Sequence, residues 1–389
     1  MTSVSRRRLL TGGAVAGLGA VAGAAVVAAG GQPATIPVAQ TGDLGTATVA
    51  FHGPRQAGVA EEPPAHAAFV AFTLAAGTDR AALSRMLRLL TDDAARLTQG
   101  IPALGDTDAT LAGLPARLTV TFGFGPGLYA AAGRPSPVAA LPAFGIDRLE
   151  PRWSGGDLLL QICADDPLTV AHTQRMLVKD ARPFAAVRWV QQGFRRSPGV
   201  QAPGHTQRNV LGQLDGTANP RGDLIDTAVW NPDGSTTLVV RRIRAEIEKW
   251  DILSVADKEN ATGRRLESGA PLSGTAEHDE PDFTALDASG LPAMPDYAHV
   301  TRAHVTDPAL KILRRPYNYD GAPDPAGHPD AGLIFASYQR DIARQFVPIQ
   351  QRLADKDLLN AWITPIGSAV FAVPPGCAPG GWIGEQSLS

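Results

Sequence analysis

The chain has 389 residues, of which 44% are hydrophobic, enough for one large buried core or two modest ones. Only 19% of the residues are charged and the formal net charge is −3, which excludes a protein that grips nucleic acid or another polyanion through a basic surface. The 41 glycines and 32 prolines favour many short elements and argue against an all-helical bundle.

The N-terminus has the pattern of an export signal. Arg6, Arg7 and Arg8 precede an uncharged run rich in Ala, Gly and Val that ends near Gly31. The letters "SRRRLL" look like a twin-arginine signal, which predicts passage through the twin-arginine export machinery to an extracellular, cell-wall or periplasmic location. Export of a folded chain suits a protein that takes up a cofactor in the cytoplasm. An uncleaved membrane anchor is the alternative, because Thr11–Ala29 is nearly long enough to span a bilayer.

Strand and helix patterns alternate in the first half of the chain. Residues 64–77, "PAHAAFVAFTLAAG", predict an apolar strand, residues 79–100 an amphipathic helix, and residues 116–126, "ARLTVTFGFGP", a second strand. The helix prediction rests on apolar residues at a 3.6-residue period: Leu83, Met86, Leu87, Leu90, Ala94 and Leu97. This order of elements is typical of an α+β unit.

The two cysteines are too few for a disulfide framework, a cysteine-based metal site or an iron–sulfur cluster. Cys163 stands in "DLLLQICADD", an apolar run that predicts a strand. We therefore expect Cys163 to be a buried apolar residue and not a nucleophile.

The second half repeats the strand, helix, strand order. The stretch "STTLVVRRIRA" predicts a strand, as does "AGLIFASYQ", and residues 340–362 predict a helix despite Pro348, with "SAVFAVPPG" as the closing strand. Two such units suggest an internal duplication, with the boundary between Arg195 and Arg208. The sequence thus predicts residues 1–40 as signal and lead, 41–200 as the first half and 201–389 as the second.

Residues 212–220, "GQLDGTANP", place the carboxylate of Asp215 among glycines. Aspartate beside glycine is a common turn signal, so the stretch predicts either a plain loop or an acid–base group held on a tight turn. Asp223 and Asp226 follow closely, but their spacing does not fit a calcium loop, and we expect them to be turn formers.

Two further segments carry residues suited to chemistry. Among eight histidines none forms an HExxH pair or pairs with a cysteine at zinc-ligand spacing, but His299 or His304 in "DYAHVTRAHVTDP" could be a single axial ligand. In "LKILRRPYNYDG", an apolar run leads into Arg314 and Arg315, and Pro316 then interrupts the element. A buried arginine is a permanent cation that could stabilise an anion; an exposed strand end is the alternative.

Seen as an ordered set, these segments resemble the dye-decolourising peroxidases. The motifs that carry the resemblance are "HGPRQAGV", "RLTVTFGFGPGLY", "RNVLGQLDGTANP", "AHVTRAH", "ILRRPYNYDG", "GLIFASYQRD" and "WITPIGSAVFAVPPG". They extend over nearly the whole chain after the signal. The resemblance implies an α+β fold of two ferredoxin-like halves packed through antiparallel sheets, with one haem b per chain in the C-terminal half.

The resemblance also implies the roles of particular residues. His299 matches the axial ligand of the haem iron, and Asp215 the distal carboxylate of the GxxDG motif. Arg314 matches the distal arginine, with Arg315 as the alternative because the doublet leaves the register open by one residue. The backbone of Gly216, Thr217 and Ala218 would lie along the haem edge.

Two departures from the family pattern stand in these motifs. Pro316 replaces a glycine that is common in the family and could reshape the distal loop. His304 stands where asparagine is frequent, which puts contacts to haem at that position in doubt.

The implied activity is oxidation of organic or dye-like donors by hydrogen peroxide through a ferryl intermediate. The reducing substrate is not specified by the sequence. Candidates for passing electrons to bulky donors are the larger aromatic residues Trp153, Trp189, Trp230, Trp250, Tyr338, Trp362 and Trp382. The alternative function is that of a haem carrier or an iron-releasing, deferrochelatase-like haem handler, which would use His299 but would not need Asp215 and Arg314.

Overall fold

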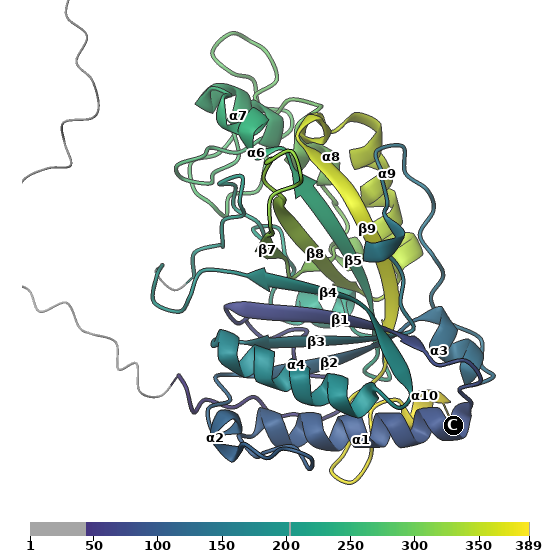
Figure 1. The fold of residues 1–389 in the computed structure, drawn as a ribbon. Helices are drawn as coiled ribbons and strands as arrows, with labels where there is room; N and C mark the ends of the chain where they lie inside the picture. The colour runs from purple at the N-terminus through teal and green to yellow at the C-terminus, as the bar shows by residue number, and fades with distance from the viewer. Residues whose placement is uncertain (1–43, 202–203, 389) are drawn as a thin grey trace, which may run out of the picture. The chain divides into compact units, whose positions relative to one another are not determined.

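The structure is a computed structural model that describes residues 44–201 and 204–388. The predicted export signal lies outside these residues. No helix within the described part of the chain is long and apolar enough to cross a membrane. The strands form one nine-stranded sheet in the order β5-β9-β2-β3-β1-β4-β7-β8-β6, with a further pairing of β5 with β8 (Figure 1).

The first half of the sheet is a complete β-α-β-β-α-β unit. Its strands are β1 (His66–Leu74), β2 (Thr119–Phe124), β3 (Leu158–Ala164) and β4 (Ala185–Phe194), and its long helices are α1 (Arg80–Thr98) and α4 (Pro167–Ala181). The strands are antiparallel in the order β2-β3-β1-β4, and α1 and α4 lie together on one face (Figure 1). This is the ferredoxin-like arrangement.

The second half repeats this topology with a long insertion. Its strands are β5 (Thr236–Ala245), β7 (Tyr317–Asp320), β8 (Ala331–Gln339) and β9 (Ile363–Val373), with the two-residue strand β6 (Leu313–Arg314) also paired with β8. The antiparallel order is β9-β5-β8-β7. The insertion between β5 and β6 carries α6 (Ile247–Asp251), α7 (Val255–Thr262) and α8 (His299–Ala303).

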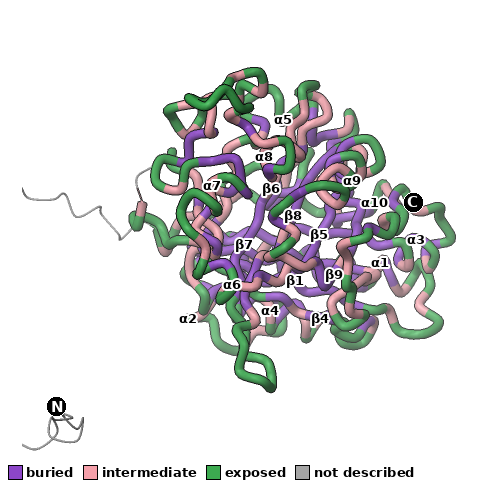
Figure 2. The backbone as a smooth tube through the Cα atoms, turned by 90° about the horizontal axis from the view of Figure 1, so that it is seen from above, coloured by how far each residue is buried: buried purple, intermediate pink, exposed green. Residues whose placement is uncertain are grey.

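The two halves pack through their sheets, as expected. Single residue pairs join the sheet edges, Phe124 with Ala372 and Phe194 with Asn318. Alternate residues of β1 serve two cores: Phe69 packs with residues of the C-terminal strands, whereas Phe72 packs under α1 and α4. Because both faces of β1 are buried, its sequence is continuously apolar and does not alternate. Figure 2 shows the same burial along the central strands, with exposed residues concentrated in the loops.

The helices begin where the sequence supplies caps. The Asp79 carboxylate accepts a hydrogen bond from the Ala82 N–H and starts α1, and Asp166 does the same for Thr169 at the start of α4. The apolar positions predicted on α1 are all buried: Leu83, Met86, Leu87, Leu90, Ala94 and Leu97. Cys163 is buried in β3, as predicted.

The segment predicted as one helix despite Pro348 is divided into three pieces. A π-helical turn (Ile342–Phe346) leads into α9 (Val347–Lys356), and a short 3₁₀ turn (Leu358–Ala361) follows. Pro348 lies in the first turn of α9, directly after the π-helical turn, in which the Val347 N–H bonds to the Ile342 carbonyl.

Asp223 and Asp226 are not turn formers, which corrects that prediction. They lie in the short helix α5 (Asp223–Ala228), and Asp226 makes an ion pair with Arg55 at 2.5 Å. Acidic side chains are favourable in a first helical turn, so their close spacing has a local structural reason. Other short helices of the described residues are α2 (Ala109–Ala112), α3 (Pro126–Ala131) and α10 (Glu385–Leu388), with 3₁₀ turns at Pro151–Trp153 and Pro308–Leu310.

Two carboxyl groups meet where α1 packs on α4. Asp93 of α1 is fully buried, and its Oδ1 accepts a hydrogen bond from the Leu104 N–H at 2.7 Å. Burial, followed by the hydrogen bond and the negative charge of Asp93, raises the pKa of Asp180 from 3.8 to about 7. The pair therefore holds a proton at mildly acidic pH.

The stability of the protein should depend on this proton. Since the folded-state pKa of Asp180 is raised, its favourable contribution is fully present below pH 3.8 and is lost as the pH rises through about 7. We expect Asp180→Asn to increase the free energy of unfolding at pH 8 by on the order of 1 kcal/mol, a value reduced by the partial exposure of the group, and to change it little at pH 4. Denaturant unfolding at the two pH values measures this. The exposed neighbour variant Asp92→Asn should show no such pH-dependent gain, and an equal gain in both variants would contradict the assignment.

Candidate active site

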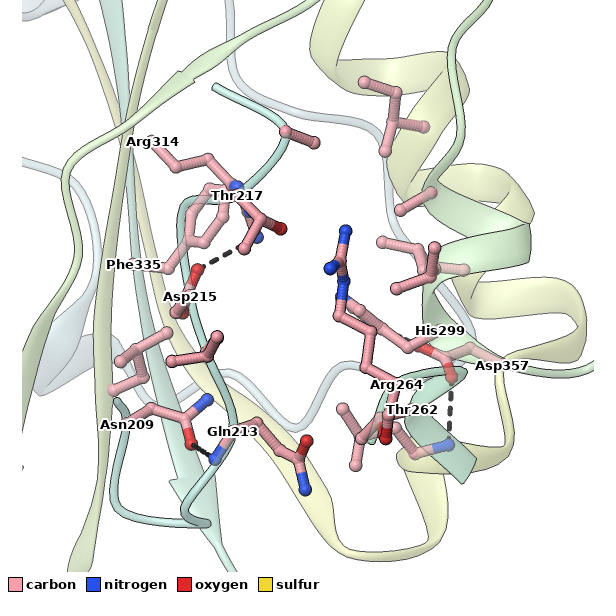
Figure 3. Close-up of a pocket in the computed structure, with 18 of the residues that line it drawn as sticks. Asn209, Gln213, Asp215, Thr217, Thr262, Arg264, His299, Arg314, Phe335 and Asp357 are labelled. Atoms are coloured by element: carbon pink, nitrogen blue, oxygen red, sulfur yellow. Dashed lines mark hydrogen bonds and ion pairs between the residues drawn. The ribbon is translucent and has the colours of Figure 1, made fainter. Parts of the chain in front are cut away.

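A cavity lies on the outer face of the C-terminal sheet, with Ile146 of the first half also on its lining. Leu333 and Phe335 of β8 line it, whereas the alternate residues Ile334 and Ala336 pack into the core between the halves. The cavity holds about 1910 Å³ of space, including its opening to solvent. Much of its wall is apolar, from Val210, Leu211, Ile243, Leu333, Phe335, Phe346, Ile349, Leu353 and Ile363. Figure 3 shows polar side chains entering it from two opposite sides.

Asp215 and Arg314 form an ion pair on one side of this cavity. Asp215 Oδ1 lies 2.9 Å from Arg314 Nη1, and the two side chains are 8% and 21% exposed. The loop before Asp215 is closed by the Asn209 side chain, which accepts hydrogen bonds from the N–H groups of Leu211 and Gln213. Gly212 adopts the positive φ of 79° that this tight turn requires. Asp215 is therefore held by a compact, internally bonded loop.

Arg315, the alternative considered for Arg314, does not line the cavity. It is 1% exposed, and its guanidinium donates a hydrogen bond to the Glu61 carbonyl. Successive side chains of a strand point to opposite faces, so only one arginine of the doublet can face Asp215. Arg314 is that arginine, because it pairs with Ser337 of β8, which lies on the same face of β8 as the cavity residues Leu333 and Phe335.

The residues after Asp215 lie differently with respect to the cavity. Thr217 and Ala218 line it, but Gly216 is not among the lining residues. A Cβ at Gly216 would meet the nearest heavy atom at 3.5 Å, which is ordinary contact, so close packing does not explain this glycine. The glycine is explained by its backbone φ of 131°, because residues with a Cβ rarely adopt that conformation.

His299 enters the cavity from the opposite side, at the start of α8 (Figure 3). Its Nδ1 lies 2.6 Å from Oδ2 of Asp357, whose side chain is 1% exposed and whose Oδ1 accepts the Leu359 N–H. Burial alone would lower the pKa of His299, but the charge and hydrogen bond of Asp357 outweigh it and raise the pKa. With Nδ1 engaged, Nε2 is the ring nitrogen available to a ligand.

His304 also lines the cavity but has different neighbours. It caps α8, and its ring lies 4.7 Å from that of Phe283. Burial lowers the pKa of His304, with Lys311 and Arg352 acting in the same direction and Glu280 opposing them. The two histidines of "AHVTRAH" are thus distinguished by their partners: His299 has a buried carboxylate and His304 an aromatic ring.

Arg264 and Asp357 are cavity residues that sequence reasoning missed. Arg264 donates hydrogen bonds through Nη1 to the carbonyls of Gly269 at 2.6 Å and Glu277 at 2.9 Å, and its side chain extends between the Asp215 side and the His299 side (Figure 3). Asp357 stands in "LADKDLLNAW", where it reads as one more surface acid near a helix end. Neither residue carries a local signal, because each reaches the cavity through long-range packing.

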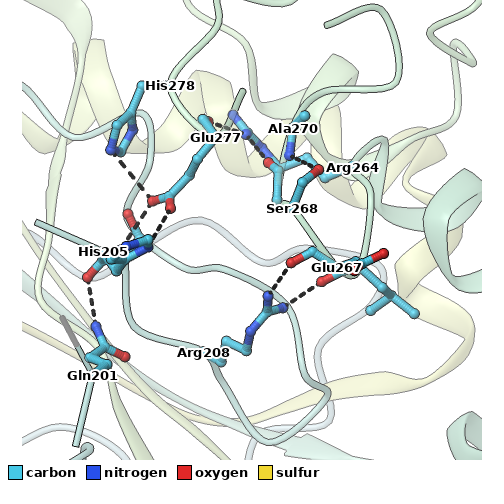
Figure 4. A network of polar contacts seen from close by, with 12 residues as sticks. Gln201, His205, Arg208, Arg264, Glu267, Ser268, Ala270, Glu277 and His278 are labelled. Atoms are coloured by element: carbon cyan, nitrogen blue, oxygen red, sulfur yellow. Dashed lines mark hydrogen bonds and ion pairs between the residues drawn. The ribbon is translucent and has the colours of Figure 1, made fainter. Parts of the chain in front are cut away.

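A second polar network holds the Asp215 loop against the segment that carries Arg264 (Figure 4). Arg208 donates hydrogen bonds to the carbonyls of Gly212, Leu266 and Glu267 at 2.7 to 2.9 Å. Glu277 accepts from the Thr206 N–H at 3.0 Å and lies near two exposed imidazoles, His205 at 3.7 Å and His278 at 3.5 Å. These contacts hold the start of the loop that leads to Asp215.

Two ferredoxin-like halves joined through their sheets are the fold that this chain shares with solved DyP-type peroxidases. Residues 56–195 match the family described as "Dyp-type peroxidase, N-terminal", and residues 206–378 match "Dyp-type peroxidase, C-terminal". The chain therefore belongs to the Dyp-type peroxidase family, whose members are haem proteins and oxidoreductases acting on peroxide.

Individual relatives agree with this assignment. The chain is 40% identical over 359 residues to a dye-decolorizing peroxidase of Thermobifida fusca, a match that covers 86% of this chain and 83% of the relative. It is 34% identical over 416 residues to a deferrochelatase of Yersinia pestis, covering 99% and 95%. A DyP-type peroxidase structure from Cellulomonas bogoriensis is 49% identical with a TM-score of 0.86, covering 89% of this chain and 99% of that one. Ferric DtpA from Streptomyces lividans is 39% identical with the same TM-score, covering 90% and 99%.

The cavity residues fit a haem. Its apolar walls suit a flat hydrophobic ring, and a histidine whose Nδ1 is held by a buried carboxylate is the usual axial donor to haem iron. Arg264 and Lys311 are cationic groups on the lining that could meet haem carboxylates. Among the described residues no cluster of three His, Cys, Asp or Glu side chains could hold a metal ion directly.

Proposed function

We propose that the protein binds one haem b in this cavity and uses hydrogen peroxide to oxidise organic or dye-like donors. The observation that carries the proposal is the Asp215–Arg314 ion pair facing His299 across one apolar cavity. Simple haem carriage needs an axial ligand but no acid–base group beside a fixed cation. The family membership of the chain supports the same conclusion.

His299 would hold the haem iron through Nε2. Its bond to Asp357 fixes the ring orientation and would make Nε2 a stronger donor to a bound metal. Bound haem would supply the iron at which peroxide is cleaved.

Asp215 and Arg314 would act on the peroxide itself. The Asp215 carboxylate would accept a proton from one oxygen of hydrogen peroxide and return it to the other, a general acid–base role. Arg314 remains positively charged and stabilises the negative charge that develops on the departing oxygen. Arg315 has no such role in this proposal, since it lies away from the cavity. Thr217 and Ala218 would contact the haem edge, whereas Gly216 serves the turn.

Mixing haem-loaded protein with hydrogen peroxide in a stopped-flow spectrometer tests the proposal. We expect the haem absorbance bands to shift within seconds of adding one equivalent of peroxide and to return when a dye donor is added, with the dye bleached. Protein with full haem content whose spectrum does not respond to peroxide would rule out the peroxidase function.

A haem carrier or iron-releasing haem handler is the second candidate, because the chain is 34% identical over nearly its whole length to proteins named deferrochelatase. The products discriminate between the two. Iron release leaves metal-free porphyrin, which chromatography detects, whereas peroxidase turnover leaves haem intact and consumes the donor.

We also propose that the chain is exported by its twin-arginine signal and works outside the cytoplasm, either released or retained at the membrane by an uncleaved signal. The "SRRRLL" pattern and the uncharged run after it support this. Fractionation of cells that express the full chain tests it, and protein confined to the cytoplasm would contradict it.

Of the aromatic residues considered for passing electrons to bulky donors, Trp153 and Trp362 are half-buried and the others are buried.

A further inference from the structure

Arg314 has both of its backbone groups turned away from the strand beside it. Strand β6 pairs with β8, and the neighbouring Arg315 N–H bonds to the Ala336 carbonyl. In an antiparallel pair, alternate residues direct their N–H and C=O groups to the other side. Those groups of Arg314 need a partner there, because unpaired backbone polar groups are costly when shielded from water.

The side chain of Asn219 supplies that partner. Its Nδ2 donates to the Arg314 carbonyl at 2.7 Å, and its Oδ1 accepts from the Arg314 N–H at 3.0 Å. The amide thus takes the place of a neighbouring strand at one residue. The backbone N–H of Asn219 also bonds to the Gly216 carbonyl at 3.0 Å and closes the turn that follows Asp215. Asn219 is therefore bonded both to the turn beside Asp215 and to the backbone of Arg314.

A second asparagine amide ties the other end of the same loop to the same stretch of chain. Asn318 of β7 accepts from the Val210 N–H at 2.9 Å and donates to the Arg208 carbonyl at 3.3 Å. Pro316, which has no N–H to donate, stands between β6 and β7, and thus between the attachment points Arg314 and Asn318. Segment 208–219 is thus held at both ends, and Asp215 lies between them.

We infer that Asn219 is a positioning residue that sets the distance between Asp215 and Arg314. This inference rests on the proposed peroxidase function. Asp215 comes from a loop and Arg314 from a two-residue strand, and the Asn219 amide bonds the turn after Asp215 directly to the backbone of Arg314. Acid–base and charge-stabilising groups lose much of their effect when displaced by about 1 Å, which can cost roughly 100-fold in rate.

Gln56 offers a matched control. Its side-chain amide makes the same reciprocal pair with a backbone residue, accepting from the Phe122 N–H at 2.7 Å and donating to the Phe122 carbonyl at 3.1 Å. Gln56 is 3% exposed and does not line the cavity. Gln56→Ala therefore removes an amide with the same reciprocal pair of bonds, and one further bond to the Pro374 carbonyl at 2.9 Å, without touching the Asp215–Arg314 pair.

The test compares haem-loaded Asn219→Ala and Gln56→Ala with the wild type. We expect both variants to unfold at lower denaturant concentration, but only Asn219→Ala to slow the spectral response to peroxide, by about 10- to 100-fold. Cyanide association, which involves no turnover but also requires loss of a proton from the incoming ligand, should slow in the same variant. Equal rates in the two variants would overturn the inference. A wild type that does not respond to peroxide would instead refute the proposed function, with cyanide association still testing the role of Asn219.

Asn219→Asp provides a second test that does not depend on Asn219→Ala folding. Its carboxylate can accept from the Arg314 N–H but can donate to the Arg314 carbonyl only when protonated. The rate of the spectral response to peroxide, divided by the wild-type rate at the same pH, should therefore rise in this variant as the pH falls from 7 to 4. A low ratio that does not change with pH, or a ratio near one throughout, would contradict a positioning role.

Discussion

Replacing His299 by alanine should remove most of the haem from the purified protein. The imidazole is the proposed axial ligand, and its loss leaves the apolar walls of the cavity as the main source of affinity. Altering even the partner of a metal-bound histidine commonly costs 10- to 100-fold in affinity, so we expect haem per protein to fall ~10-fold or more. Haem absorbance relative to protein absorbance, after loading with excess haem, measures the loss.

His304→Ala is the control for this result. His304 lines the same cavity from the same short helix, but it contacts Phe283 and not a buried carboxylate. We expect this variant to keep its haem. A His304→Ala protein without haem, beside a His299→Ala protein that retains it, would show that the ligand assignment is reversed.

Peroxide cleavage should depend on both members of the Asp215–Arg314 pair, with haem retained in each variant. Asp215→Ala removes a proton carrier, which should slow the response to peroxide by ~10²–10⁴. Arg314→Ala removes a fixed positive charge, for which ~10²–10³ is typical. Because water can carry a proton but substitutes poorly for a fixed charge, we expect Arg314→Ala to be at least as damaging as Asp215→Ala. Second-order rates of the spectral response, measured for both variants, give the ranking.

Lys249→Ala is a suitable control for the loss of positive charge. Lys249 is exposed and does not line the cavity, so its removal should leave the rate of the response to peroxide within a few-fold of the wild type. An Arg314→Ala variant that reacts at nearly the wild-type rate would leave Asp215 as the only group needed for cleavage.

Pro316 does not prevent the pairing of Arg314 with Asp215, because the Asn219 amide and strand β8 hold the arginine from both sides.

The arginine doublet shows where sequence reasoning reached its limit. The letters "LRRP" indicate a buried cation next to a break, but they do not say which arginine faces the cavity. That choice depends on how β6 aligns with β8, a strand that follows it in the chain, and a shift of one residue would exchange the two side chains.

Asp357 shows the same limit at the other side of the cavity. His299 could be singled out from its motif, but its carboxylate partner stands 58 residues further along the chain. Nothing in the sequence around Asp357 marks it, since an aspartate before a helical turn is a common cap. Its role follows from the packing of α8 against α9.

By itself, the amino-acid sequence determined the strands and helices, the repeated order of elements, the motifs of a dye-decolourising peroxidase and the candidate residues His299 and Asp215. These features depend on local patterns: apolar spacing, capping residues and turns that require glycine. Only the tertiary structure decided which arginine pairs with Asp215, that Gly216 is not among the residues lining the cavity, that Asp357 bonds to His299 and that Asn219 bonds to Arg314. Those outcomes depend on strand register and on contacts between segments far apart in the chain, and such contacts leave no mark on the residues next to them in sequence.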